Sequence, residues 1–130
     1  MFDKYMIVEQ GFRNRTEGGK PVGFEFGARL PYYRGLGLSM VEDVGVTVDG
    51  KAVPREAVSL RLRGRRWTLA QMETEYDEAW GMGEVATVEV DWPGGLSPGA
   101  HALELAERLR ISYMPFPGGG KDAKTLVLEG

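Results

Sequence analysis

The sequence predicts an all-β fold, an antiparallel β-sandwich or jelly-roll-like domain with at most a short helix near residues 68–73. The chain contains 19 glycines and 7 prolines in clusters, as expected for turns that separate strands. The segments between these clusters are rich in β-branched and aromatic residues or alternate in polarity. About seven or eight short strands in a chain of this length fit a sandwich. With 130 residues, we expect one domain over residues 1–130.

The expected strands follow one another along the chain at short intervals. They are Tyr5–Arg13, Val22–Leu30, Val44–Val48, Val58–Arg63, Val85–Trp92 and Leu126–Leu128. Asp49-Gly50 predicts a type I′ hairpin turn, because both of its central positions need positive φ, which Asp tolerates and Gly accepts freely. Lys51–Val53 is the expected return strand.

Two further segments required a choice between helix and strand. Thr68–Glu73 predicts one or two helical turns, with Thr68 as N-cap and Gln71 completing a capping box. Ala100–Tyr113 has apolar residues that fit either a helical stripe or one face of a long strand. We favour the strand, because Pro93–Gly99 has the composition of a loop joining Val85–Trp92 to an antiparallel partner. Pro115–Gly120 is interpreted as a surface loop.

Composition limits the classes of partner. Hydrophobic residues make up 42% of the chain and charged residues 27%, which is typical of a globular protein. The net charge of −3 disfavours nucleic acid and anionic membranes, and the cluster of four arginines in residues 61–66 is too short to change that. No apolar run reaches the roughly 18 residues of a membrane helix, and residues 1–10 do not resemble a signal peptide. The absence of cysteine suits a reducing cytoplasm, where we expect the protein.

The residue inventory does not point to an independent active site. His101 is the one histidine, so no metal triad with two imidazoles can form within the chain, and a structural or solvated role is expected. No serine lies in a nucleophile-elbow setting. The carboxylates at 42–43 and 73–78 match neither a glycosidase pair nor an EF-hand, so 73–78 is interpreted as a solvated loop. Gly118–Lys121 lacks the remainder of a P-loop and is interpreted as a mobile loop.

Two segments, Leu30–Leu38 and Ile111–Pro117, combine aromatic, Met and Arg residues with backbone-restricting residues. These side-chain types are enriched in the cores of protein interfaces. The alternative is that their tyrosines close the ends of the sandwich, and both interpretations remain open. Arg34 favours contact for the first segment, because a buried Arg needs a partner.

Several motifs spread over the chain are linked by their order and spacing. They are Met1–Val8 with Gly11–Asn14, Leu30–Gly35 through Ser39 to Glu42-Asp43, Val48–Gly50 with Val53–Glu56, and Leu109–Pro115. Together they resemble the small β subunit of bacterial C-glycoside deglycosidases. The resemblance runs from Met1 nearly to the C-terminus and is weakest over residues 65–83.

The resemblance implies a β-sandwich subunit of a heteromeric complex. Its α subunit would be a metal-dependent TIM barrel of the xylose-isomerase type, with manganese as the typical divalent metal. The complex would act as a lyase on the carbon–carbon bond between a 3-oxo sugar and an aromatic aglycone such as a flavonoid. No cofactor and no catalytic residue is carried over to this chain. The residues expected to contact the substrate or the partner are Tyr32, Tyr33, Arg34, Met114 and Phe116.

Two other functions compete with this one. A free-standing carbohydrate-binding sandwich would use its three tryptophans, Trp67, Trp80 and Trp92, to stack on sugar faces. Burial of these side chains would argue against it. A homo-oligomeric scaffold without a catalytic partner is the third possibility.

Overall fold

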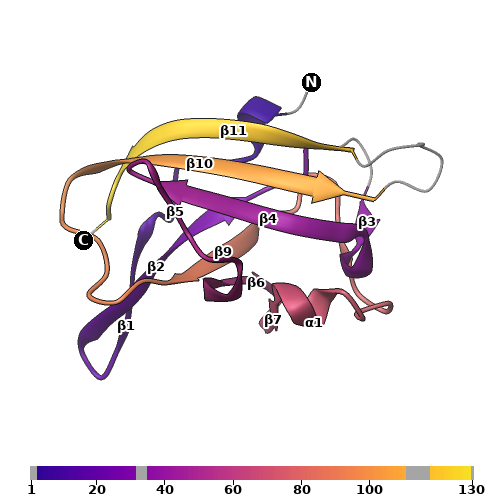
Figure 1. Cartoon of the computed structure of the whole chain (residues 1–130), viewed down its shortest axis with the longest axis horizontal. Helices are drawn as coiled ribbons and strands as arrows, with labels where there is room; N and C mark the ends of the chain where they lie inside the picture. The colour runs from indigo at the N-terminus through magenta and orange to yellow at the C-terminus, as the bar shows by residue number, and fades with distance from the viewer. Residues whose placement is uncertain (1–2, 32–34, 111–117, 130) are drawn as a thin grey trace.

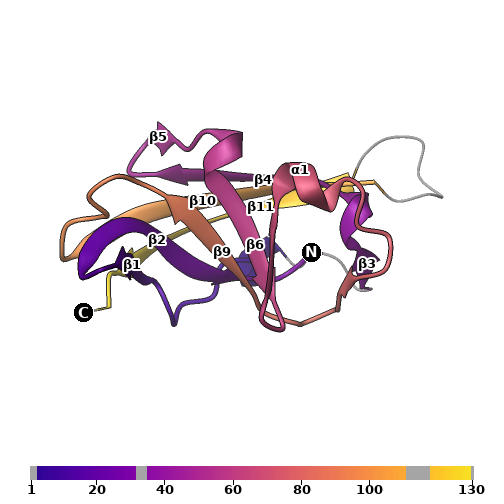
Figure 2. The same ribbon diagram turned by 90° about the horizontal axis from the view of Figure 1, so that it is seen from below.

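The computed structural model describes residues 3–31, 35–110 and 118–129. Two antiparallel sheets lie face to face, with a short helix at one side (Figures 1 and 2). The five-stranded sheet has the order β1 (Arg13–Glu17), β2 (Lys20–Ala28), β9 (Ala86–Asp91), β6 (Val58–Leu62), β7 (Arg65–Thr68). The four-stranded sheet has the order β11 (Gly118–Val127), β10 (Ala100–Leu109), β4 (Val41–Val48), β5 (Lys51–Ala52). The predicted all-β class is confirmed.

The remaining elements are short. β3 (Leu36–Gly37) pairs with β8 (Ala79–Trp80) in a separate two-stranded sheet. The helical elements are α1 (Leu69–Met72) and the 3₁₀ turns η1 (Asp3–Tyr5), η2 (Leu38–Met40) and η3 (Arg55–Ala57). None of the helical segments in the described part of the chain is long and apolar enough to cross a membrane.

The core lies between the two sheets and follows from strand alternation. Along β10, burial alternates residue by residue, so that Leu103, Leu105 and Leu109 face inward. They belong to the same buried cluster as Phe24 of β2 and Val88 of β9. For Ala100–Tyr113 we favoured a strand over a helix, and this is confirmed as far as Leu109, where β10 ends.

Local turn and cap signals were predicted correctly. Asp49 and Gly50 have φ values of 50° and 79°, and they connect β4 to β5. Thr68 and Gln71 form the predicted capping box, with the Gln71 backbone N–H donating to Thr68 Oγ1 (3.1 Å) and the Thr68 N–H to Gln71 Oε1 (2.9 Å). A second hairpin, with Arg63-Gly64 as the turn between β6 and β7, was not predicted.

The prediction of a strand over Tyr5–Arg13 was wrong. Met6 and Ile7 are both buried, which breaks the alternation that a half-buried strand requires. Ile7 forms only an isolated bridge to Ala28, and Gly11 has a φ of +90° that turns the chain before β1. The segment therefore lies along the sandwich without becoming a regular strand.

Two interpretations of longer segments were also wrong. The first is the prediction of a mobile loop over Gly118–Lys121, since these residues begin β11. The backbone at Gly119 approaches β10 so closely that a Cβ would lie 2.1 Å from the Glu107 carbonyl oxygen.

The second is the expected pairing of Val85–Trp92 with the long strand. Strands β9 and β10 are not partners: β9 pairs with β2 and β6, and β10 pairs with β4 and β11. The loop between them crosses from one sheet to the other, and Leu96 within it is 9% exposed and hydrogen-bonded to Asn14.

Candidate functional site

Described residues next to the two predicted contact segments, Ser39, Met40 and Arg110, meet at one end of the sandwich. Tyr32, Tyr33, Arg34, Met114 and Phe116 themselves lie outside the described residues. The flanking elements meet where β10 ends: the Arg110 N–H donates to the Met40 carbonyl (2.8 Å), and the Arg110 guanidinium donates to the Ser39 carbonyl (3.3 Å). Both views show β3 and the end of β10 at this same end (Figures 1 and 2).

A polar hollow of about 470 Å³ opens beside these anchors. Three arginines and three acids dominate its lining, and within it Arg55 contacts Asp43 at 2.5 Å and Arg108 contacts Glu42 at 3.4 Å. The lining residues are Ser39, Val41, Glu42, Asp43, Arg55, Glu73, Arg108 and Arg110. Because acids and arginines balance one another, the hollow has no surplus charge to attract an ion.

The sequence predicted a solvated loop over residues 73–78, and the structure contradicts this for two of its four carboxylates, Glu75 and Glu78. Glu75 accepts a hydrogen bond from Trp67 Nε1 at 2.9 Å, and this bond lowers the pKa of Glu75 more than any other contact. Glu78 pairs with Arg63 and Arg65, each at 3.1 Å. The arginine cluster of residues 61–66 is thus neutralised by this segment and by Glu89, which contacts Arg61 at 2.6 Å. Sequence alone could not pair these two opposite runs.

The lone histidine has a structural role. His101 is 7% exposed, and both of its ring nitrogens face acceptors: Nδ1 lies 2.6 Å from Asp49 Oδ2, and Nε2 lies 2.7 Å from the Ser97 carbonyl. The bond to Asp49 is the main cause that raises the pKa of His101. With both nitrogens engaged, the imidazole is not available as a metal ligand or as a catalytic base.

A second titratable group was missed by the sequence analysis. Glu107 occupies an inward-facing position of β10 and is 4% exposed. Its two carboxylate oxygens have no hydrogen-bond partner among the described residues, and burial raises the pKa of Glu107 well above its usual range. The signal was present in the sequence, because Glu107 shares the alternating positions of Leu103, Leu105 and Leu109.

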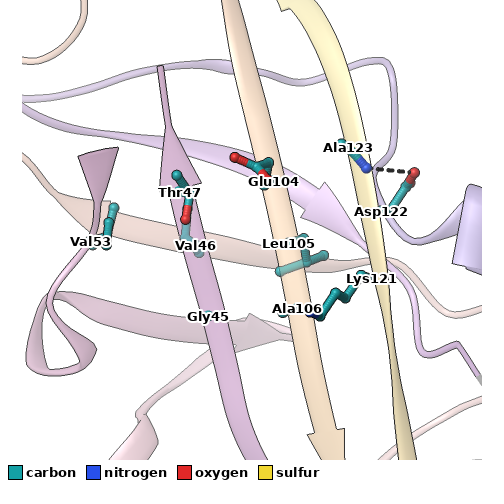
Figure 3. Close-up of a pocket in the computed structure, with 11 residues that line it drawn as sticks. Gly45, Val46, Thr47, Val53, Glu104, Leu105, Ala106, Lys121, Asp122 and Ala123 are labelled. Atoms are coloured by element: carbon teal, nitrogen blue, oxygen red, sulfur yellow. Dashed lines mark hydrogen bonds between the residues drawn. The ribbon is translucent and has the colours of Figure 1, made fainter. Parts of the chain in front are cut away.

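The outer face of the four-stranded sheet carries a shallow hollow of about 460 Å³ (Figure 3). Small residues form its middle: Gly45 of β4 lies opposite Ala106 of β10, and Ala123 of β11 lies opposite Glu104 of β10. Lys121 extends from β11 toward Ala106, and Glu104 stands on the same face (Figure 3). The opposite outer face, by contrast, is covered by ion pairs, among them Arg61 with Glu89.

The described residues include no group of three or more His, Asp or Glu side chains that could hold a metal ion.

The three tryptophans do not form a sugar-stacking surface. Trp67 and Trp80 are 5% and 0% exposed, and the half-buried Trp92 packs edge-on against Phe24 at 6.1 Å between ring centroids. Burial of this kind argues against the carbohydrate-binding alternative.

Comparison with known proteins places the chain in a family. Residues 2–113 match the family model described as C-glycoside deglycosidase beta subunit. The 3'-dehydrocarminate deglycosidase beta subunit of a Microbacterium species is 37% identical over 119 residues, 91% of this chain and 85% of the relative. The C-glycoside deglycosidase beta subunit of Eubacterium cellulosolvens is 34% identical over 114 residues, 87% of this chain and 78% of the relative. One from Arthrobacter globiformis is 30% identical over 95 residues, 72% of each chain. The chain therefore belongs to the family of C-glycoside deglycosidase beta subunits.

Proposed function

We propose that this chain is the non-catalytic β subunit of a heteromeric enzyme that cleaves the carbon–carbon bond of 3-oxo-C-glycosides. The observation that carries the proposal is its family membership over residues 2–113. A relative named for 3'-dehydrocarminate supports a substrate oxidised at the 3' position. The structural role of His101, with both ring nitrogens engaged, supports placing acid–base chemistry in another subunit.

The proposed reaction is an elimination by a lyase. A ketone at C3 of the sugar acidifies the neighbouring C2 proton, so a base can remove it. The electron pair then forms the C1–C2 double bond while the bond from C1 to the aglycone breaks, and the aglycone carbon takes up a proton. The partner, proposed to be a TIM-barrel α subunit, would supply the base and a divalent metal, with manganese expected, that polarises the ketone. No metal site is assigned to this chain.

The proposed contribution of this chain is to stabilise the complex and to help shape the pocket for a flavonoid-type aglycone. Tyr32, Tyr33, Arg34, Met114 and Phe116 are the side chains proposed to contact the aglycone or the partner, by stacking or hydrogen bonding. Their support is that the segments flanking them meet at one end of the sandwich, where Arg110 bonds Met40 and Ser39. We propose a cytoplasmic complex.

Co-expression tests this function directly. Three preparations are made: this chain alone, the α subunit of a C-glycoside deglycosidase from the same genome alone, and the two chains produced together. Each preparation is assayed for release of aglycone from a 3-oxo-C-glycoside, with and without EDTA and with manganese added back. We expect turnover by the pair, loss with EDTA and recovery with manganese. Turnover by this chain alone in the absence of metal would contradict the proposal.

A further inference from the structure

Residues 73–84, which follow α1, are called the braced loop here because two arginines of the β6–β7 hairpin hold them. Arg63 forms ion pairs with Glu78 (3.1 Å) and Glu84 and donates to the Ala79 carbonyl (2.8 Å). Arg65 forms ion pairs with Glu78 (3.1 Å) and Glu75 (3.4 Å). Three carboxylates of the loop are therefore directed toward the sandwich and neutralised.

Both indoles at this end reinforce the same segment. Trp67 Nε1 donates to Glu75 (2.9 Å), and Trp80 Nε1 donates to the Glu84 carbonyl (2.8 Å). The backbone of η2 closes the other side, with the Ser39 N–H donating to the Glu75 carbonyl (3.2 Å) and the Leu38 N–H to the Glu78 carbonyl (3.0 Å). The loop is thus fixed from two directions although only β8 within it is regular structure.

Two large apolar side chains of this fixed loop nevertheless point into solvent. Tyr76 is 75% exposed and Met82 is 63% exposed. Tyr and Met are enriched in interface cores, and a side chain on a pre-organised backbone loses less conformational entropy when it is bound. A loop that is stabilised at many points and still exposes a Tyr and a Met has the properties of an interface anchor.

The charges next to Tyr76 indicate the character of what binds it. Glu73 has a side chain that is 64% exposed and lies 3.9 Å from Arg55, its one ion-pair partner among the described residues. Asp77 is exposed, and no described side chain pairs with its carboxylate. Among the acids of the loop, three are paired with arginines of the β6–β7 hairpin, whereas Asp77 has no described partner and Glu73 has only the 3.9 Å contact with Arg55. A complementary surface would carry Arg or Lys around an apolar pocket.

The braced loop also lies at the end of the sandwich where η2 meets the end of β10, since the Ser39 N–H donates to the Glu75 carbonyl and the Arg110 N–H to the Met40 carbonyl. β8 of the loop pairs with β3, so Leu36 lies opposite Trp80. Gly35 packs so closely that a Cβ there would lie 3.2 Å from Gly81 Cα, next to Met82. The braced loop is therefore packed against Gly35–Gly37, the described residues that begin the next part of the chain.

We propose that the braced loop is a docking surface for the α subunit, with Tyr76 and Met82 entering an apolar pocket whose border carries Arg or Lys. This inference rests on the proposed function, because it assumes the heteromeric complex. To the proposed function, the inference adds the residues and the chemistry of the contact between the two subunits. A second copy of this chain is the competing occupant.

The test uses the full chain and the α subunit from the same genome. Tyr76→Ser and Met82→Ser are compared with Val127→Ser, since Val127 is 69% exposed but lies at the far end of β11. Binding to the immobilised α subunit is measured by biolayer interferometry, and circular dichroism melts check the fold of each variant. We expect each loop variant to bind at least about tenfold more weakly and the Val127 variant to bind like the wild type.

Charge and self-association provide the second readout. Glu73→Gln with Asp77→Asn should lower the association rate several-fold and flatten its dependence on NaCl, because long-range attraction to a basic rim is lost.

The outcomes separate the docking surface from the proposed function. If the wild-type chain binds the α subunit and the Tyr76 and Met82 variants bind equally well, the docking surface is wrong while the function stands. If the wild type does not bind at all, the proposed function fails. Loss of a homodimer in sedimentation velocity without loss of α-subunit binding would assign the surface to a second copy and overturn the proposal.

Discussion

His101 Nδ1 lies 2.6 Å from Asp49 Oδ2 and joins the start of β10 to the turn of the β4–β5 hairpin. The other carboxylate oxygen of Asp49 accepts the Ala102 N–H at 2.9 Å, and the remaining His101 nitrogen faces the Ser97 carbonyl. Because both ring nitrogens face acceptors, the fold favours the doubly protonated imidazolium. One charged pair thus fixes the hairpin, the long strand and the crossing loop together.

This pair makes stability depend on pH in a defined direction. The pKa of His101 is raised in the folded state, so its contribution is fully present below the unfolded value of about 6.5 and is lost as pH rises through the folded pKa. The Asp49 pKa is lowered, chiefly by the bond from His101, so its contribution is present above about 3.9 and is lost as pH falls through the folded pKa. We expect His101→Gln to lower the free energy of unfolding by about 1–3 kcal/mol near pH 6. Urea unfolding followed by tryptophan fluorescence from pH 4 to 9 checks this, and a variant with unchanged pH dependence would contradict it.

Glu107 should destabilise the folded protein at high pH, because its carboxyl is buried without a described partner. Its folded pKa is raised, so the favourable protonated state is fully present below about 4.3 and is lost as pH rises through the folded pKa. We expect Glu107→Met to raise the free energy of unfolding by about 1–3 kcal/mol at pH 8 and by less at pH 5. The same unfolding experiment at the two pH values measures it. Destabilisation by Glu107→Met at both would mean that the carboxylate is paired in the folded protein.

Arg63 should control the order of the braced loop more than the stability of the sandwich, because its ion pairs with Glu78 and Glu84 are on the surface. We expect Arg63→Gln to speed amide hydrogen exchange over residues 75–84 and to leave the urea midpoint nearly unchanged. Arg13→Gln is the matched control, since Arg13 pairs with Glu129 at 3.7 Å on an exposed edge. Hydrogen exchange with mass spectrometry compares the two. Equal protection of the loop in both variants would show that Arg63 does not brace it.

Gly119 tests how closely β11 and β10 approach each other. A Cβ at this position would lie 2.1 Å from the Glu107 carbonyl oxygen, so Gly119→Ala must push the strands apart and should cost about 2 kcal/mol or more. Gly45→Ala is the control, because its Cβ would meet nothing nearer than 3.5 Å. Thermal unfolding by circular dichroism should show a clear drop for the first variant and little change for the second. Similar melting of both would refute the close approach.

Local signals in the sequence were sufficient for single turns and strand faces. Asp49-Gly50 adopts two positive φ values, and Thr68 with Gln71 forms the capping box. The choice of a strand for Ala100–Tyr113 was right as far as Leu109, although its reason, an antiparallel pairing with Val85–Trp92, was wrong. These features depend on backbone torsions and side-chain periods within a few residues, so neighbouring residues determine them.

The family resemblance also came from the sequence, and the comparisons confirm it. The residues it suggested for contact, Tyr32 to Arg34, Met114 and Phe116, remain predictions, since they lie outside the described part of the chain. All of the braced loop except Glu84 lies within residues 65–83, where the resemblance was weakest. No local pattern distinguishes its paired acids from its unpaired ones.

The sequence by itself determined the all-β class, the hairpin at Asp49-Gly50, the cap of α1 and the family. Only the tertiary structure decided that β9 and β10 belong to different sheets and that Gly119 lies within a strand. It also decided that Glu75 and Glu78 face Arg63 and Arg65 of the β6–β7 hairpin, while Tyr76 and Met82 face solvent. The physical reason is distance along the chain. Torsions and alternation are set by adjacent residues, whereas sheet partners, ion pairs and exposure depend on which distant segments are brought together when the core forms.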